Sequence, residues 1–363
     1  MKKTVFNFEP RTKNILFLGD PLGIQRFDKP KYPIFSDLAR KQLQFIWMPE
    51  RISLLEDRAK YRNLTDTEKF IFDTNLRVQT LIDSLLMRGL DLLKSNVTNE
   101  ELENTLSVHS MVETSIHSFS YTHILRSLME KNMSEFFDSI LLDDNITTRA
   151  KTIVEAYDSL FDAPEADIKS NILNTIIQNY ITEGVMFYTS FVTSFYFGAK
   201  LGFKAADIVK EIARDENLHC ANFLNIFKIL RDDPEEGFYD LINNDEFHQK
   251  VYTAFEIAVK SEKEWSKYIF SKGDLVGLNE ETLNGYIEWI ANNRLTSLGY
   301  KKIFNQRKNP LGSWINPFFG TDGEGNEVKL QVAPQESNTI TSYKLNSING
   351  DVTEDDYSSL QLD

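Results

Sequence analysis

Two Glu–His pairs lie at helical spacing in this chain of 363 residues. Glu216 precedes His219 by three residues, and Glu113 precedes His117 by four. Residues three or four apart share one face of a helix, so the carboxylate and the imidazole of each pair can reach the same metal ion. One such pair is weak evidence, because helix-rich chains offer it by chance, and an exposed glutamate near an ordinary histidine is then the simpler interpretation.

Two further acids stand in apolar surroundings. Asp83 lies within TLIDSLL and Glu183 within YITEGVMFY, while Glu113 and His117 lie in MVETSIHSFSY. Burying a carboxylate or an imidazole among apolar side chains is costly unless a partner offsets it. Each acid taken singly could equally well meet an arginine or cap a helix.

Taken together, the four acids and two histidines match the ligands of ferritin-like two-metal carboxylate proteins. Those proteins use one acid from each of two helices and a Glu/His pair from each of the other two. Oxygen and imidazole ligands suit iron or manganese better than they suit metals that prefer thiolates. The sequence therefore predicts a site for two metal ions, with ligands Asp83, Glu113, His117, Glu183, Glu216 and His219.

Four long helices are needed to carry these ligands, and the sequence predicts them. No proline occurs between Pro49 and Pro164, which favours uninterrupted helices. Capping-box signals at Thr65–Glu68 and Thr98–Glu101 open the first two helices, and the second should end near Met129.

The third helix, expected over residues 167–199, is apolar on most sides and should be surrounded by other helices. The fourth is expected over residues 205–230. No period of 20–50 residues repeats, so the fold class is an all-α bundle without repeats.

Composition limits the possible functions. No apolar run approaches the roughly 18 residues of a membrane span, and the first residues, MKKTVFNFEP, lack the apolar core of a secretory signal. The single cysteine, Cys220, excludes an intramolecular disulfide and a cysteine-based zinc cage. A net charge of −14 is unfavourable for binding a nucleic-acid backbone. We therefore expect a cytoplasmic protein with no membrane or nucleic-acid partner.

The character of the chain changes near Gly320. The last 44 residues hold nine acidic and two basic side chains and little apolar periodicity. Such a segment does not bury enough apolar surface to fold alone. We expect a ferritin-like helical domain over residues 1–319 and a flexible acidic tail over residues 320–363.

Four segments of the chain resemble the small subunit of class I ribonucleotide reductase. They are SIHSFSYTH at residues 115–123, IARDENLH at 212–219, QTLIDS at 79–84 and EGVMFYTSF at 183–191. The resemblance implies a homodimeric, ferritin-like subunit that uses iron or manganese and dioxygen to make a tyrosyl radical. It also implies a larger catalytic subunit as partner, which reduces ribonucleotides to deoxyribonucleotides. Di-iron is the expected centre, with manganese or a mixed manganese–iron pair left open.

Tyr121 occupies the position of the radical tyrosine in that family. It follows His117 by one helical turn on the same face, so its ring should lie near the metals, although a packed core tyrosine fits the spacing as well. The resemblance further implies that Trp47 and Asp215 lie beside His117 in a relay toward the large subunit. Asp215 would orient the imidazole by accepting its free N–H. Phe187, Phe191 and Ile212 match the apolar pocket that surrounds the radical in that family.

The chain departs from the commonest family pattern at one position. The glutamate usually precedes the histidine by three residues, whereas Thr114 stands at that place here and Glu113 lies four before His117. Spacings of three and four share a helix face, and a local π-bulge would also absorb the extra residue. We predict that Glu113, not Thr114, is the ligand. His109, two turns before His117, is a conceivable extra ligand, but a surface or core histidine is the better interpretation.

The end of the chain, YSSLQLD, carries apolar anchors suited to a groove on the large subunit. In the family a relay tyrosine precedes the terminal Gln-Leu, which implies this role for Tyr343. Composition alone would make Tyr343 one aromatic residue in a solvated tail. Two alternatives have less need of such a tail: a related two-metal oxidase acting on a bound apolar ligand, and a metal-storing or purely structural bundle.

Overall fold

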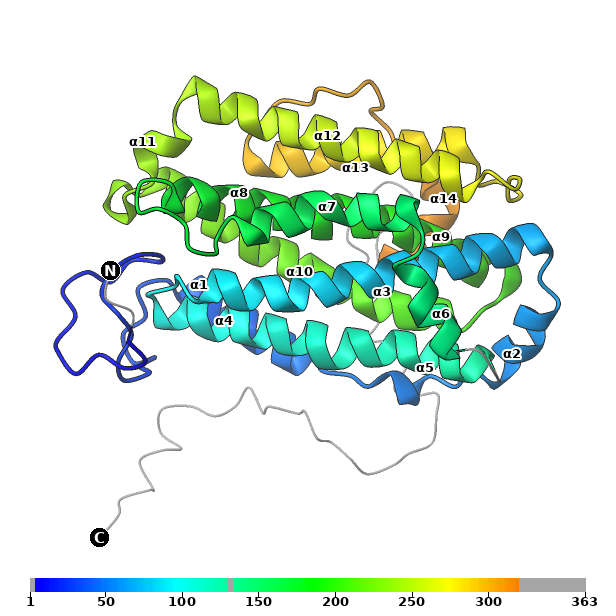
Figure 1. Ribbon diagram of the computed structural model, residues 1–363, viewed down its shortest axis with the longest axis horizontal. Coiled ribbons are helices and arrows are strands. Elements are labelled where there is room, and N and C mark those ends of the chain that lie inside the picture. The colour runs from blue at the N-terminus through cyan, green and yellow to red at the C-terminus, as the bar shows by residue number, and fades with distance from the viewer. Residues whose placement is uncertain (1–3, 130–132, 320–363) are drawn as a thin grey trace, which may run out of the picture.

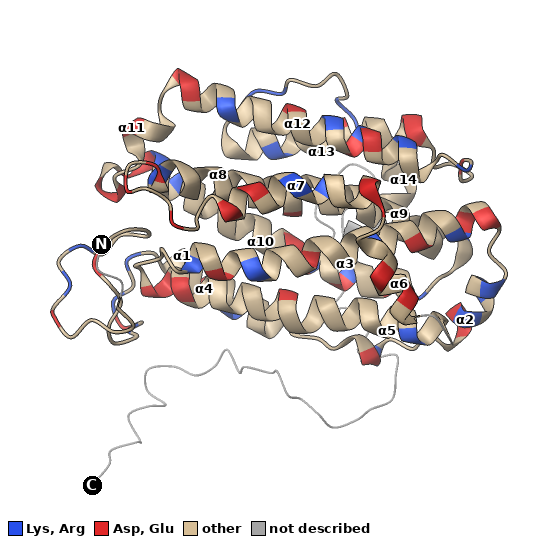
Figure 2. Ribbon diagram, in the orientation of Figure 1, with Lys and Arg blue, Asp and Glu red and all other residues tan. Residues whose placement is uncertain are grey.

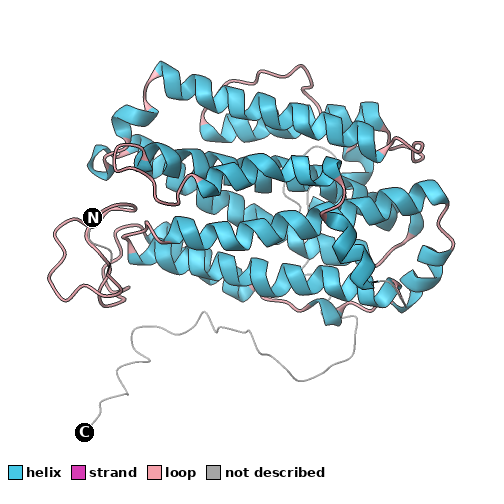
Figure 3. Cartoon of the chain, in the orientation of Figure 1, coloured by secondary structure: helices cyan, strands magenta, loops and turns pink. Residues whose placement is uncertain are grey.

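Helices make up the regular structure of this chain. The computed structural model describes residues 4–129 and 133–319, and within those ranges the only β-type pairings are two isolated bridges, Phe17 with Val97 and Leu275 with Leu278. Figures 1 and 3 show long helices running roughly side by side. The expected tail over residues 320–363, with Tyr343, lies outside the described residues.

The four predicted helices are present. The first is α3, Asp66–Lys94. The second is built from α4, Glu100–Met111, η2, Val112–His117, and α5, Ser118–Leu128. The third runs through α8, Ile168–Ile181, η3, Thr182–Met186, and α9, Phe187–Leu201, and the fourth is α10, Ala205–Asp232. The other helices are α1 Pro33–Gln44, η1 Pro49–Arg51, α2 Leu55–Arg62, α6 Met133–Ile140, α7 Asp144–Asp158, η4 Pro234–Glu236, α11 Tyr239–Ile242, α12 Asp245–Ile269, α13 Glu280–Leu298 and α14 Gly312–Phe319.

One of the two predicted capping boxes is wrong. The Thr65–Glu68 box at the start of α3 is confirmed, since both of its reciprocal hydrogen bonds form. At the start of α4 the cap is Asn99, whose side chain accepts from the backbone N–H of Leu102. The Thr98 hydroxyl instead accepts from the N–H of Gly19 and donates to the carbonyl of Ile15, which joins the N-terminal segment to the bundle.

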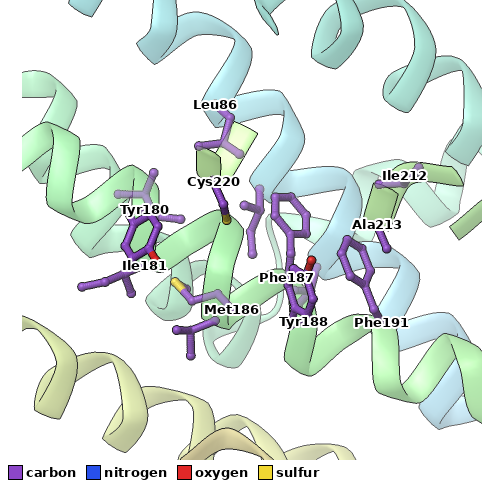
Figure 4. Close-up of a cluster of buried hydrophobic side chains, with 14 of the residues drawn as sticks. Leu86, Tyr180, Ile181, Met186, Phe187, Tyr188, Phe191, Ile212, Ala213 and Cys220 are labelled. Atoms are coloured by element: carbon purple, nitrogen blue, oxygen red, sulfur yellow. The ribbon is translucent and has the colours of Figure 1, made fainter. Parts of the chain in front are cut away.

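The prediction that the third helix is surrounded is confirmed. Every residue of α9 from Phe187 to Phe197 is buried, and the helix contacts α3, α10, α13 and α14. Figure 4 shows Phe187, Tyr188 and Phe191 in one apolar cluster with Ile212 of α10. The pair α12 and α13 covers one side of the bundle, next to α7 and α8, and α4 with α5 lies on the opposite side (Figure 1).

Charged residues of both signs are interspersed along the outer helices (Figure 2). Within residues 4–129 and 133–319, no helix is both long enough and apolar enough to cross a membrane.

Candidate metal centre

All six predicted ligands meet in the middle of the bundle, and a seventh side chain joins them. They come from α3, from the helix that includes η2, from the helix that includes η3, and from α10. None is more than 1% exposed. The seven residues are Asp83, His109, Glu113, His117, Glu183, Glu216 and His219.

The cluster divides into two groups of four that share Glu113. One group holds Asp83, Glu113, His117 and Glu216, and the other holds His109, Glu113, Glu183 and His219. Within each group one potential ligand atom from every residue lies within 4.8 Å of the others. Two metal positions joined by a common carboxylate fit this division.

Glu113 connects the two Glu–His pairs that the sequence singled out. Its Oε2 lies 3.1 Å from His117 Nδ1, and its Oε1 lies 3.0 Å from His219 Nδ1. His219 Nδ1 also lies 2.9 Å from Glu216 Oε2. Each imidazole thus points one nitrogen at carboxylate oxygens rather than at the backbone.

Many polar atoms of the cluster have no hydrogen-bond partner among the described residues. They include both oxygens of Asp83, both oxygens of Glu183, Oε1 of Glu216 and Nε2 of His219. Buried polar atoms are nearly always satisfied, because each unsatisfied one costs free energy. Carboxylate and imidazole atoms aimed at a common point fit a pair of divalent metal ions.

The electrostatics of the cluster agree with that fit. Burial raises the pKa of Asp83 well above its ordinary value, and the neighbouring Glu113 carboxylate raises it further. The same two causes raise the pKa of Glu216. For Glu113 itself, burial also acts upward, but the charge of His117 and hydrogen bonds from imidazoles outweigh it and hold the pKa well below the usual range. Bound cations would relieve the repulsion among these acids.

A π-helix accommodates the extra residue between Glu113 and His117. In η2 the backbone N–H of Ser118 bonds to the carbonyl of Glu113, five residues back. Thr114 is exposed, and its hydroxyl donates to the carbonyl of Ser110, 2.7 Å away. Of the two routes considered from the sequence, the structure uses the π-bulge, and it places Glu113 rather than Thr114 in the cluster.

A second π-helix, η3, carries Glu183 and was not predicted. Two arginines from distant helices bind carbonyls of this segment: Arg294 Nε donates to the Gly184 carbonyl at 3.0 Å, and Arg149 Nη2 donates to the Met186 carbonyl at 2.8 Å. A Cβ at Gly184 would lie 2.8 Å from Arg294 Nε, which is too close. A glycine inside an otherwise apolar helix was the one sequence signal for this close approach.

Arg149 also forms a buried ion pair with Glu262 of α12. We expect Arg149→Met to lower the free energy of unfolding by about 3–5 kcal/mol, because it leaves the Glu262 carboxylate buried without its partner. Urea denaturation of the metal-free protein measures this, with Lys250→Ala, in the exposed Glu246–Lys250 pair, as control. The double change Arg149→Met, Glu262→Gln should recover part of the loss. A loss under about 1 kcal/mol for Arg149→Met would contradict the expectation.

Tyr121 lies in the same buried region, with its ring 1% exposed. Burial and the nearby Asp83 carboxylate raise the pKa of its phenol well above 10, so the hydroxyl stays protonated at neutral pH. The expected pocket residues Phe187, Phe191 and Ile212 are fully buried, and the two phenylalanine rings stack with their centroids 5.6 Å apart. Water is therefore excluded from these side chains.

Trp47 and Asp215 lie beside His117, as the family resemblance implies. Trp47 Nε1 donates to Asp215 Oδ2 at 2.8 Å, and the same oxygen lies 3.4 Å from His117 Nε2. Met48, next to Trp47, is 39% exposed, so this chain of side chains runs from the cluster to the edge of the bundle.

Comparison with known proteins agrees with the resemblance found in the motifs. The family model described as "Ribonucleotide reductase, small chain" matches residues 25–310. The "Ribonucleoside-diphosphate reductase subunit beta" of Buchnera aphidicola subsp. Baizongia pistaciae is 35% identical over 371 residues, with 96% of each chain covered. The "Ribonucleoside-diphosphate reductase 1 subunit beta" of Escherichia coli O157:H7 is 34% identical, again with 96% of each chain covered. The solved "Ribonucleotide reductase R2 subunit from Clostridium botulinum" superposes with a TM-score of 0.80 at 29% identity and covers 88% of this chain and 98% of that one.

Proposed function

The chain belongs to the small-chain family of ribonucleotide reductase, and we propose that Tyr121 stores the oxidising equivalent that its large subunit uses to reduce ribonucleotides. The observation that carries the proposal is the joint burial of Tyr121 with a cluster of acids and imidazoles, several of whose ligand atoms have no hydrogen-bond partner among the described residues. A storage or structural bundle has no need of an oxidisable phenol in that position.

Asp83, Glu113, His117, Glu183, Glu216 and His219 would hold two metal ions. Their oxygen and imidazole donors suit iron or manganese, and either pair remains compatible with this donor set. When bound, the ions would supply, with dioxygen, the one-electron oxidation of a nearby phenol.

The protein contributes the surroundings of that oxidation. Tyr121 is a neutral phenol, so its oxidation to a neutral radical must release the hydroxyl proton. Asp83, the carboxylate that most strongly raises the pKa of Tyr121, would receive that proton. The buried Phe187 and Phe191 would shield the radical from water and offer no hydrogen atom that is easily removed. A radical held there would be long-lived.

Asp215 fixes the orientation of His117. If Asp215 Oδ2 accepts a hydrogen bond from the Nε2–H of His117, then Nδ1 carries the free lone pair, and Nδ1 is the atom that faces Glu113. Trp47 donates to the same carboxylate oxygen. These contacts support a relay from the buried cluster, through His117, Asp215 and Trp47, toward a partner at the surface.

The large catalytic subunit is the partner that the family implies. We propose in addition that the chain forms a homodimer, that it acts in the cytoplasm, where Cys220 stays reduced, and that residues 320–363 dock on the large subunit with Tyr343 as the relay residue. The docking of residues 320–363 and the relay role of Tyr343 are proposed from the sequence, since these residues lie outside those that the structure describes.

We expect the metal-loaded full-length chain to support nucleotide reduction when it is mixed with the large subunit of a relative. Tyr343→Phe should abolish turnover while its association with the large subunit stays intact. Truncation after Thr353 should instead weaken association and leave the radical formed. Deoxyribonucleotide formation, binding assays and electron paramagnetic resonance give the three readouts.

Tyr357→Phe is the matched control, because it alters a tyrosine of the same tail. Any loss in that variant should be restored by excess large subunit, whereas Tyr343→Phe should not be rescued. Normal turnover by Tyr343→Phe would show that the relay assignment is wrong. Absence of turnover by the parent chain, whichever metal is loaded, would argue against the proposed function itself.

A further inference from the structure

His109, for which the sequence favoured a surface or core histidine over an extra ligand, lies buried inside the cluster. It belongs to α4, one helical turn before Glu113, and is 1% exposed. Its Nε2 lies 3.2 Å from Glu183 Oε1 and 3.5 Å from Glu113 Oε1. Its ring stacks on that of His219, with centroids 3.5 Å apart and an interplanar angle of 22°.

An ordinary core histidine does not explain this placement. A buried imidazole normally satisfies at least one ring nitrogen with the backbone, a side chain or water. Neither Nδ1 nor Nε2 of His109 has a hydrogen bond of normal geometry among the described residues. Among the described residues, Nδ1 therefore has no partner, and Nε2 faces the carboxylates of Glu183 and Glu113 without a well-formed hydrogen bond.

The distances fit a shared metal ion. Ligand atoms bound at about 2.1 Å and separated by 90–109° at the metal lie roughly 3.0–3.4 Å apart. The separations from His109 Nε2 to Glu183 and Glu113 are 3.2 and 3.5 Å, and His219 Nδ1 lies 3.0 Å from Glu113. These three separations are close to those expected between ligand atoms bound to one metal ion.

We propose that His109 is a third imidazole ligand, which together with Glu113, Glu183 and His219 forms the second metal position. This inference rests on the two-metal centre of the proposed function. It makes the two positions chemically unequal, because the first, with Asp83, Glu113, His117 and Glu216, has one imidazole and the second has two. Nitrogen ligands strengthen the preference for later divalent metals, so the second position discriminates more strongly against manganese.

The alternative role for His109 is a hydrogen-bond donor that positions Glu183 without touching a metal. Glutamine separates the two roles, because its amide still donates a hydrogen bond but is a poor ligand for these ions. Alanine removes both functions. His248, a half-buried histidine of α12 outside the cluster, provides the matched control as His248→Gln.

The test is a titration of the metal-free full-length chain with Co²⁺, followed by absorbance. The parent chain and His248→Gln should bind two equivalents. In His109→Gln and His109→Ala the affinity for the second equivalent should fall by about 100-fold or more, since loss of a ligand exceeds the 10- to 100-fold cost of losing a residue that only supports one. The first equivalent should be unchanged. Wild-type affinity for both equivalents in His109→Gln would reduce His109 to a positioning residue and overturn the proposal.

A second measurement needs no variant. Each imidazole bound to Co²⁺ keeps one exchangeable N–H proton, whose NMR signal the ion shifts far outside the normal range. We expect three such signals from the fully loaded parent chain, from His109, His117 and His219, and two signals would exclude His109. Failure of the parent chain to bind any metal would instead count against the proposed function, so the two failures are distinguishable.

Discussion

Replacing Glu113 with alanine is expected to reduce metal binding from two equivalents per chain to less than one. Glu113 is the only residue common to both groups of potential ligands among the described residues, and its two oxygens face His117 and His219 separately. Its loss therefore removes an anionic ligand from each position, whereas the changes proposed at His109 weaken only one. Elemental analysis after loading with iron or manganese measures the effect.

Thr114→Ala is the control for this prediction. The Thr114 side chain is exposed and hydrogen-bonds within its own helix, so its replacement should leave both equivalents bound. If Thr114→Ala lost metal and Glu113→Ala retained it, the π-helix η2 would direct Thr114 rather than Glu113 toward the metals. The assignment of Glu113 as the ligand would then be wrong.

The second large effect is expected at Tyr121. Tyr121→Phe should abolish the tyrosyl signal in electron paramagnetic resonance and reduce nucleotide reduction to background, while the metal content stays at two equivalents. The reason is that phenylalanine keeps the shape of the buried ring but removes the hydroxyl whose hydrogen atom is lost on oxidation. The metal ligands are untouched by the change.

Tyr188→Phe provides the comparison, because Tyr188 is also buried, lies on α9, and donates its hydroxyl to Asn217. This variant should keep the radical signal. If Tyr121→Phe turned over at the parent rate, the oxidising equivalent would reside elsewhere than on Tyr121, and the proposed role of this residue would be wrong even with a full complement of metal.

Much of the bundle could be predicted because its signals are local. The capping box gave the start of α3, and helical periodicity gave both ends of α10 to within about two residues. Asp83 and Glu183 stood out as acids in apolar strings, and the structure brings both of them to the cluster. In each case the pattern repeats along one element and needs no knowledge of its neighbours.

The features that were missed depend on distant parts of the chain. The π-helix η3 is bound by Arg149 and Arg294, which lie more than 30 and 100 residues away from it in sequence. His109 joins the cluster through contacts with Glu183 of η3 and His219 of α10, which are both more than 70 residues away in sequence. Asn99 replaces Thr98 as the cap because the N-terminal segment takes the Thr98 hydroxyl for itself. None of these contacts leaves a periodic pattern in the sequence.

The closure of the bundle around the cluster has a kinetic consequence. With every potential ligand at most 1% exposed, an ion enters or leaves only when packed helices separate transiently. The rate of exchange then follows the free energy of that opening, and each additional 1.4 kcal/mol of opening cost slows exchange by about tenfold. Affinity alone would not decide which metal a given molecule carries. The bound ion would instead be the one that was present when the helices last opened.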